Sequence, residues 1–256
     1  MSVPRKSALG ESELNRIGLG TNRLTTTPGN VELIREAVAS GVDMIDTAHS
    51  YTGGESEATI GEALSSVSDV CVVATKGGWG PDGRPEVLRA QIEESLRRLR
   101  TDSIDLYYLH RVDPETPLEE SLGAIAEYQE RGKIRHVGLS EVGVEEIERA
   151  RQVLPIAAVQ NRFNLSERMH DEVVEHCAGE GILFVPFFPL RGDGGPEVEE
   201  IAANHRATAA QIALAWLLRR SPAMLPIPGT LSSEHLRENV AAVSVELSDA
   251  EFEALS

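Results

Sequence analysis

The sequence predicts a single (β/α)8 barrel, the TIM-barrel arrangement of the α/β class, formed by residues 1–256. Eight short β-branched or apolar runs alternate with segments whose apolar residues have helical spacing. The length of 256 residues is typical of one such barrel. No linker rich in Pro, Gly or Ser divides the chain, and its composition does not shift along the sequence. We therefore expect one domain.

The expected strands follow one another along nearly the whole chain. They are residues 16–20, 44–48, 70–75, 104–110, 134–140, 157–162, 182–187 and 224–228. Helical spacing is clearest in four intervening segments, residues 31–39, 87–99, 118–129 and 212–218. This alternation favours a parallel sheet, because each helix carries the chain back across one face of the sheet. Closing eight such units into a barrel fits their number better than an open doubly wound sheet does.

Capping signals mark several of the expected helix boundaries. Thr208 and Gln211 have the spacing of a capping box at the start of a helix. Gly41, Gly132 and Gly181 each end a helix shortly before a strand. These residues support the division of the chain into alternating units.

Charge and cysteine content exclude several classes of function. The chain has 24 Lys and Arg against 41 Asp and Glu, a net charge of −17. Such acidity argues against a nucleic-acid partner and an anionic membrane surface. Two cysteines are too few for a disulfide framework, and no targeting segment is visible, so we expect a cytoplasmic protein. We expect a small-molecule substrate and, by default, a monomer.

Polar residues gather where the expected strands end. They are Asp46 and His49 after the second strand, Lys76 after the third, His110 on the fourth, Ser140 on the fifth, and Gln160 and Asn161 on the sixth. Active sites of barrel enzymes lie at the C-terminal ends of the strands. A structural role would not favour Lys or His at successive strand ends. The convergence of these side chains on one rim therefore indicates an enzyme.

Three of these residues form a chemical set with Tyr51, on the loop after the second strand. A lysine ammonium close to a phenol hydroxyl favours the phenolate, and an aspartate beside the lysine holds it in place. A neutral histidine can orient a substrate carbonyl. Taken singly, Asp46 could cap a turn, Tyr51 could be a loop aromatic and His110 a core residue. Together with Lys76 they describe a general acid that protonates an oxygen while another group attacks the carbon.

A series of motifs in the same order resembles the aldo/keto reductase family. GVDMIDTAHSY at 41–51, followed by GESE at 54–57, is similar to that family's second strand and loop. VATK at 73–76 and DLYYLH at 105–110 resemble its third and fourth strands. GKIRHVGLS at 132–140 and VQNRFN at 159–164 resemble the fifth and sixth, and IPGT at 227–230 resembles the cofactor-phosphate segment.

The resemblance implies an NAD(P)H-dependent oxidoreductase that reduces an aldehyde or ketone to an alcohol by hydride transfer, without a metal. The family's catalytic tetrad falls on Asp46, Tyr51, Lys76 and His110. Tyr51 would donate the proton and Lys76 would activate it. Asp46 would anchor Lys76, and His110 would orient the carbonyl oxygen. Trp79, with Tyr51 and His110, is expected to line the substrate pocket.

The resemblance also implies a set of cofactor contacts. Ser140 and Gln160 would hold the carboxamide of the nicotinamide, and Phe187 would stack on its ring. The other expected contacts are Gly20, Thr21, Asn22, Asp46, Pro189, Leu190, Arg191, Ile227, Gly229, Thr230, His235, Arg237, Glu238 and Asn239. Gly229 stands where many relatives have lysine, so the 2′-phosphate would rely on Thr230, His235 and Arg237, with Arg191 as a further candidate. We expect NADPH as the cofactor, with use of NADH left open.

Two other classes of function stay open from the residues alone. A metal-dependent barrel hydrolase would need several His, Asp or Glu ligands at strand ends, and the His-x-His pair typical of such sites does not occur. A non-catalytic NADP-binding sensor or accessory subunit could use the same fold, although the complete tetrad argues against it. Cofactor turnover with a simple aldehyde would distinguish a reductase from a metal-dependent hydrolase and from a non-catalytic NADP-binding protein.

Overall fold

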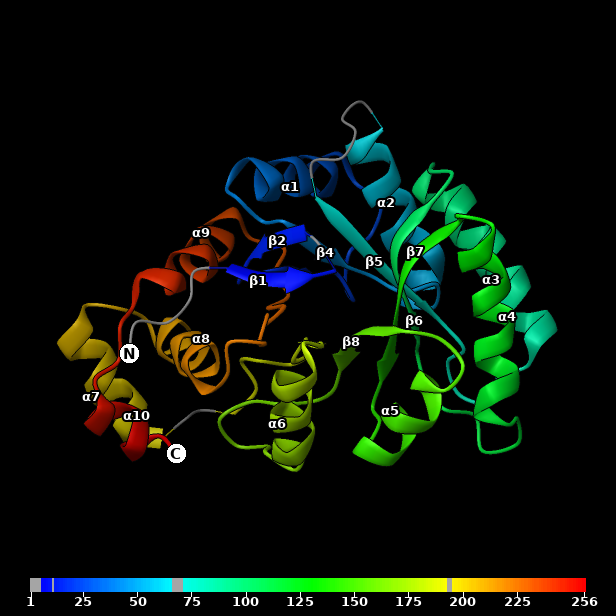
Figure 1. Cartoon of the computed structure of the whole chain (residues 1–256). Coiled ribbons are helices and arrows are strands. Elements are labelled where there is room, and N and C mark those ends of the chain that lie inside the picture. Colours follow the sequence, from blue (N-terminus) through cyan, green and yellow to red (C-terminus); the bar gives the residue numbers. More distant parts are fainter. Residues whose placement is uncertain (1–5, 11, 66–70, 193–194) are drawn as a thin grey trace.

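Seven parallel strands form the central sheet of the computed structural model, which describes residues 6–10, 12–65, 71–192 and 195–256 (Figure 1). The strands are β3 (Leu19–Gly20), β4 (Met44–Asp46), β5 (Val72–Gly77), β6 (Ile104–Leu109), β7 (Ile134–Ser140), β8 (Ile156–Gln160) and β9 (Leu183–Phe184). Each pairs with the next in chain order. The sheet curls, so that the two edge strands approach the same segment of chain.

That segment, residues 223–229, closes the ring between β9 and β3. The N–H of Phe184 donates to the carbonyl of Ala223 at 2.9 Å, and the N–H of Gly20 donates to the carbonyl of Pro228 at 3.3 Å. The expected strand at 224–228 is wrong as a regular strand, although its place in the ring is right. Its two prolines have no N–H to donate, so a continuous ladder cannot form.

Other strand boundaries also differ from expectation. The strand expected at 182–187 is only Leu183–Phe184, because Pro186 cannot donate to a ladder. The strand expected at 16–20 is only Leu19–Gly20. The third strand runs on to Gly77, which places Lys76 inside the strand, whereas Val70 of the expected range 70–75 lies outside the described residues.

Helices surround the ring of strands (Figure 1). They are α1 (Pro28–Ala39), α2 (Glu55–Leu64), α3 (Pro85–Leu99), α4 (Leu118–Glu130), α5 (Val144–Arg151), α6 (Asp171–Glu180), α7 (Gly195–His205), α8 (Ala209–Arg220), α9 (Ser233–Ala241) and α10 (Asp249–Ala254). The capping box of Thr208 and Gln211 is confirmed at the start of α8. Gly41, Gly132 and Gly181 have φ values of +90°, +72° and +69°, the left-handed conformation that ends a helix.

A β-hairpin that the sequence did not lead us to expect lies across one end of the barrel (Figure 1). It consists of β1 (Lys6–Leu9) and β2 (Ser12–Asn15). Leu9 and Leu14 are buried in the cluster of residues that fills the barrel interior, which includes Leu106. The hairpin therefore closes the N-terminal end of the barrel and leaves the opposite end for a ligand.

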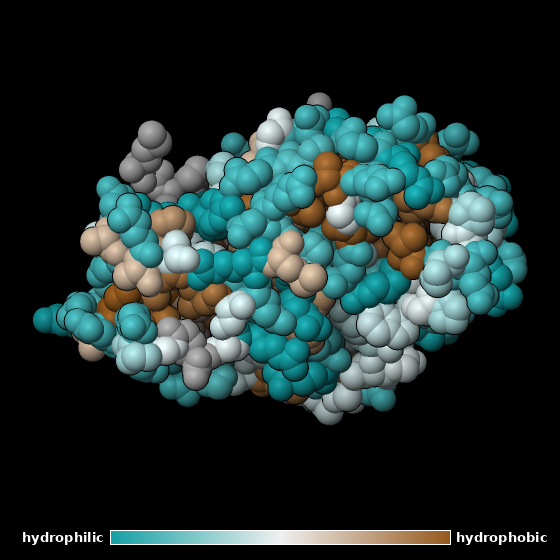
Figure 2. Space-filling model, turned by 90° about the horizontal axis from the view of Figure 1, so that it is seen from below, coloured by the Kyte–Doolittle hydropathy of each residue, from teal (hydrophilic) through white to brown (hydrophobic). Residues whose placement is uncertain are grey.

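The larger apolar core fills the space between the strands and the helices. Branched aliphatic residues dominate this layer, with Phe163, Phe184 and Trp216 among the few aromatics. Figure 2 shows the side that carries α5, α6 and α10, where hydrophobic residues appear in separate groups between hydrophilic ones. Among the described residues, no helix combines the length and apolarity that crossing a membrane requires.

Candidate active site

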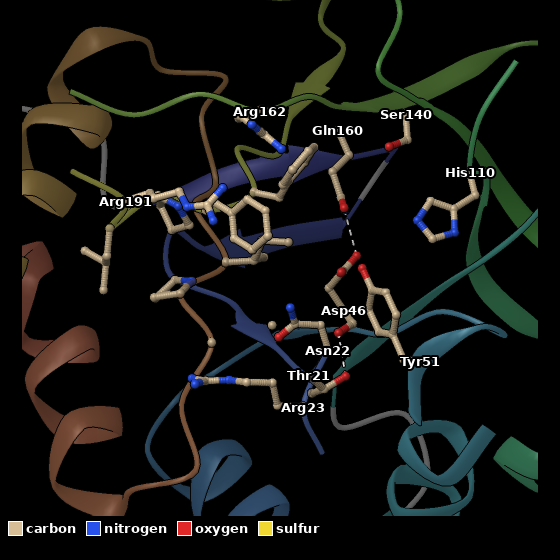
Figure 3. Close-up of a pocket in the computed structure, with 18 of the residues that line it drawn as sticks. Thr21, Asn22, Arg23, Asp46, Tyr51, His110, Ser140, Gln160, Arg162 and Arg191 are labelled. Carbon is tan, nitrogen blue, oxygen red and sulfur yellow. Dashed lines mark hydrogen bonds between the residues drawn. The ribbon is translucent and has the colours of Figure 1, made fainter. Parts of the chain in front are cut away.

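A cavity of about 660 Å³ opens at the C-terminal ends of the barrel strands (Figure 3). Its walls come from the ends of β3, β4, β6, β7 and β8, and from the loops after β4, β5 and β9. The lining residues are Gly20, Thr21, Asn22, Arg23, Asp46, Tyr51, Trp79, His110, Arg111, Ser140, Gln160, Arg162, Phe187, Phe188, Pro189, Leu190, Arg191, Ile227, Pro228 and Gly229. The volume is in the range of small-molecule sites.

Lys76 lies fully buried behind the cavity wall and uses all three of its N–H donors. Its Nζ atom lies 2.6 Å from Oδ1 of Asp46, 2.7 Å from the carbonyl oxygen of Thr47 and 3.4 Å from the hydroxyl of Tyr51. An ammonium group has three donors, so this set fixes its orientation. Because all three donors are used, the ammonium group is fixed beside Tyr51, whose hydroxyl accepts one of its hydrogen bonds.

Asp46 completes this network. Its second oxygen, Oδ2, accepts a hydrogen bond from the side-chain amide of Gln160 at 2.8 Å (Figure 3). Burial raises the pKa of Asp46, while Lys76 and Gln160 oppose that rise. Burial acts to lower the pKa of Lys76, but the charge of Asp46 and the nearby Tyr51 outweigh it, so the pKa is raised. The 2.6 Å contact between Nζ and Oδ1 is a buried ion pair.

His110 is neutral at physiological pH. Burial lowers its pKa to about 2, and the charges of Lys76 and Arg111 act in the same direction. Its Nδ1 atom is buried and has no hydrogen-bond partner within the part of the chain that the structure describes. The ring lies edge-on to Tyr51, with centroids 6.0 Å apart, and both side chains face the same space (Figure 3). A neutral imidazole in this position can hydrogen-bond a carbonyl group.

An unusual backbone path after Tyr51 places its side chain over the cavity. Thr52, Gly53 and Gly54 all have positive φ values, and the Thr52 hydroxyl donates to the carbonyl of Leu24 at 2.7 Å. A Cβ atom on Gly54 would lie 2.3 Å from the guanidinium carbon of Arg98. The φ of +96° favours glycine at position 54, and a side chain there would also displace the guanidinium of Arg98.

The residues expected to meet the nicotinamide all line the cavity. The amide of Gln160 is held by Asp46, and the hydroxyl of Ser140 accepts a hydrogen bond from Arg111 at 3.0 Å. Glu141, next to Ser140, has a φ of +57°. Its carboxylate accepts the backbone N–H of Arg162 at 2.6 Å, which joins the ends of β7 and β8.

The cofactor residues expected beyond Gly229 do not line this cavity. They are Thr230, His235, Arg237, Glu238 and Asn239, on or just before α9. Arg237 forms an ion pair with Glu36 of α1, with Nε 3.2 Å from Oε1. The structure therefore brings together the residues expected to form the tetrad and to meet the nicotinamide, whereas Thr230, His235 and Arg237, expected at the 2′-phosphate, do not line this cavity.

Sequence reasoning missed Arg111 and Arg162, two half-buried arginines in the cavity wall. Arg111 directly follows His110, and Arg162 lies two residues after Gln160 at the end of β8. The rule that strand ends supply the site of a barrel would have identified both. Within the described ranges, no three His, Cys, Asp or Glu side chains are grouped so that they could hold a metal ion.

The sequence matches the profile of the Aldo/keto reductase family over residues 16–195 and 193–256. It is 39% identical to an uncharacterised oxidoreductase of Schizosaccharomyces pombe, with 96% of this chain and 87% of the relative covered. It is 37% identical to the pyridoxine 4-dehydrogenase of Escherichia coli, with 94% of this chain and 93% of that enzyme covered.

Solved structures are similar along nearly the whole chain. A thermostable aldo-keto reductase in complex with the inhibitor epalrestat superimposes with a TM-score of 0.91, 36% identity and 98% of both chains covered. An aldo/keto reductase from Klebsiella pneumoniae in complex with NADP and acetate has a TM-score of 0.89 and 29% identity, with 99% of this chain and 94% of the other covered. These likenesses confirm the expected (β/α)8 barrel.

Proposed function

Because this chain belongs to the aldo/keto reductase family of NAD(P)H-dependent oxidoreductases, we propose that it reduces an aldehyde or ketone to an alcohol with Tyr51 as the proton donor. The observation that carries the proposal is the contact between the Tyr51 hydroxyl and the ammonium of Lys76, 3.4 Å apart. A hydroxyl that accepts a hydrogen bond from a cation gives up its own proton more readily. It can therefore serve as a general acid.

The cavity fits a dinucleotide cofactor. Four of its lining residues are arginines, and its one carboxylate, Asp46, is already neutralised by Lys76. The end of β3 packs closely against the closing segment, since a Cβ atom on Gly20 would lie 2.8 Å from the carbonyl oxygen of Ile227. Glycine at position 20 therefore permits the close approach of these two segments at the edge of the cavity. The Klebsiella relative, which was crystallised with NADP, supports NADPH as the cofactor.

Different parts of the cavity wall and of α9 would hold the nicotinamide, the pyrophosphate and the 2′-phosphate of the cofactor. Ser140 and Gln160 would bind the nicotinamide carboxamide, and Phe187 would lie against the ring. Residues 20–22 and 189–191 would hold the pyrophosphate region. The 2′-phosphate would be bound on α9 by Arg237, which would exchange its contact with Glu36 for the phosphate.

When bound, the nicotinamide supplies a hydride to the carbonyl carbon. Tyr51 gives its proton to the carbonyl oxygen and becomes a phenolate, which the ammonium of Lys76 stabilises. His110, held neutral, donates a hydrogen bond to the same oxygen and fixes the direction of the carbonyl. The side chain of Tyr51 is half-buried, so water can return the proton. In the oxidative direction the same phenolate takes the proton of the alcohol.

The experiment that tests this function is turnover by the purified chain. NADPH oxidation is followed at its absorbance maximum with a panel of simple aldehydes and ketones, and cofactor binding is measured separately by fluorescence. We expect NADPH-dependent reduction and formation of the alcohol. Tight NADPH binding without turnover of any carbonyl compound would instead favour a sensor or accessory subunit.

A further inference from the structure

The charge of the cavity is the reverse of the charge of the whole chain. The protein carries a net charge of −17, yet its cavity is lined by Arg23, Arg111, Arg162 and Arg191, with Asp46 as the one acidic residue. These arginines fall into two groups. Arg23 and Arg191 are exposed on the loops expected to hold the cofactor, whereas Arg111 and Arg162 are half-buried at the ends of β6 and β8.

Arg111 occupies the part of the cavity where the carbonyl chemistry is expected. It follows His110 in the chain, and its guanidinium carbon lies 4.8 Å from the ring centre of Trp79. The same Trp79 ring is 4.5 Å from the ring of His110. The charges of Glu141 and Tyr51 both act on the pKa of Arg111, which burial lowers. Arg111 therefore lies beside the carbonyl-orienting group.

One edge of the Arg111 guanidinium has no acceptor. Its Nη1 atom donates to the carbonyl of His110 at 2.6 Å and to the hydroxyl of Ser140 at 3.0 Å. No described residue accepts a hydrogen bond from its Nε or Nη2 atom, or forms an ion pair with it. The charge of Glu141 acts on Arg111, but no carboxylate contacts this edge of the guanidinium, so an anionic ligand can form charge-assisted hydrogen bonds there. The Nε–Nη2 edge presents two parallel donors, the geometry that matches a carboxylate.

We propose that Arg111 binds a carboxylate of the substrate, so that the preferred substrate is an aldehyde or ketone that also carries a carboxylate group. The inference rests on the proposed carbonyl reduction and names the substrate class of that same site. The ring of Trp79, which lies next to both His110 and Arg111, would contact the part of the substrate between the carbonyl and the carboxylate. Arg111 is then a specificity-determining residue, and Tyr51 remains the proton donor for every substrate.

Arg162 offers a matched control within the same cavity. It also lies against aromatic rings, 5.7 Å from Phe187 and 5.5 Å from Phe188. Its Nε atom is buried without a partner, but its charge is paired with Glu167, 3.2 Å from Nη1. A non-specific effect of positive charge on the cavity would be reduced by removal of either arginine. A specific contact with a substrate carboxylate requires Arg111 alone.

The first experiment compares two aldehydes that differ in charge, 4-carboxybenzaldehyde and its methyl ester, in wild type, Arg111→Gln and Arg162→Gln. The quantity of interest is the ratio of kcat/KM for the acid to kcat/KM for the ester. Effects on cofactor binding cancel in this ratio, and the intrinsic reactivity difference between the two aldehydes cancels when the ratio in a variant is compared with that in wild type. We expect Arg111→Gln to lower this ratio about 10- to 100-fold, the worth of a lost charge-assisted hydrogen bond. We expect Arg162→Gln to change it by less than about 3-fold.

The outcomes separate the inference from the proposed function. An unchanged ratio in an Arg111→Gln enzyme that still reduces the ester would overturn the role of Arg111 and leave the reductase function standing. An equal fall in both variants would also overturn it, since general cavity charge would then be responsible. A wild-type enzyme that reduces neither aldehyde would count against the proposed function. If 4-formylphenyl phosphate shows the larger Arg111-dependent preference, the carboxylate assignment is wrong and phosphate is the bound group.

A binding measurement makes the test independent of turnover. Sodium benzoate is titrated into the cofactor-free protein at constant ionic strength, with intrinsic tryptophan fluorescence, from Trp79 in the cavity and Trp216 in the core, as the readout and benzamide as the neutral control. We expect benzoate to bind wild type at least 10-fold more tightly than it binds Arg111→Gln, with Arg111→Lys in between because it keeps the charge and loses the two-donor edge. Equal binding of benzoate and benzamide to wild type would contradict the inference, even if the Arg111→Gln chain failed to fold.

Discussion

The Nζ atom of Lys76 lies 2.6 Å from Oδ1 of Asp46, and both side chains are removed from solvent. This ion pair joins β5 to β4 directly beneath the hydroxyl of Tyr51. A buried pair of this kind is sensitive to the loss of one partner, because the remaining charge has no water to solvate it. The same contact thus bears on both the stability of the barrel and the orientation of Tyr51, the proposed proton donor.

We expect Lys76→Met to lower the free energy of unfolding by about 3–5 kcal/mol at neutral pH, because it leaves the carboxylate of Asp46 buried without its counterion. Adding Asp46→Asn to Lys76→Met should restore part of that loss, since the isolated charge is then removed. The energetic coupling between Lys76 and Asp46 is measured by urea unfolding of the wild type, the two single variants and the double variant. Strictly additive losses would show that the two charges do not depend on each other.

Tyr51→Phe should retain the fold and NADPH binding while losing most of the carbonyl reduction. General acid catalysis contributes about 10²–10⁴-fold, and the phenyl ring keeps the shape of the side chain without its proton. Steady-state kinetics with a simple aldehyde, alongside a fluorescence titration with NADPH, test this. Near-wild-type turnover in a variant that binds the cofactor would remove Tyr51 from the mechanism.

The same lysine should govern the pH dependence of alcohol oxidation. Removal of the ammonium in Lys76→Met disfavours the phenolate that accepts the alcohol proton, so the profile of kcat/KM should move in the alkaline direction. Asp46→Asn should cause a smaller change of the same sign, because it loosens Lys76 without removing its charge. An unshifted profile in an active Lys76→Met enzyme would mean that Lys76 only positions its neighbours.

His110 should make the protein less stable in acid. Its pKa is lowered from 6.5 to about 2 in the folded chain, chiefly by burial, so the unfolded chain binds the proton first as the pH falls. The stability associated with neutral His110 is complete above about pH 6.5 and declines below it by about 1.4 kcal/mol per pH unit. Comparing wild type with His110→Asn between pH 7 and pH 5 isolates this slope. Equal slopes would place the pKa of His110 near its ordinary value.

Cofactor preference should depend on the ion pair between Arg237 and Glu36. Arg237→Ala should weaken NADPH binding by about 1.5–3 kcal/mol and leave NADH binding nearly unchanged, since only NADPH carries the 2′-phosphate. Glu36→Gln should tighten NADPH binding, because it frees Arg237 from its competing carboxylate. The test is to measure the dissociation constants of NADPH and NADH for wild type, Arg237→Ala and Glu36→Gln. Equal losses of NADPH and NADH in Arg237→Ala would place the phosphate elsewhere.

Local sequence patterns sufficed to predict the barrel and the rim on which the candidate site lies. Alternation of strand and helix patterns implies parallel strands, and the C-terminal ends of parallel strands must meet at one edge. That rule alone brings Asp46, Lys76, His110 and Gln160 together. The rule does not depend on exact strand boundaries. It also holds although two prolines interrupt the expected eighth strand.

Contacts between distant segments were decided only by the tertiary structure. Arg237 and Glu36 are 201 residues apart in the chain, and no local pattern relates them. The hairpin that closes the barrel is short and lacks a clear alternation, and its place depends on packing against strands formed much later in the sequence. The Arg111 edge that has no hydrogen-bond acceptor among the described residues is likewise invisible in the sequence, because a lone arginine after a strand does not reveal which acceptors surround it. The spacing of apolar residues indicates which face of a segment packs against the core. Contacts between side chains of distant segments depend on how the whole chain folds.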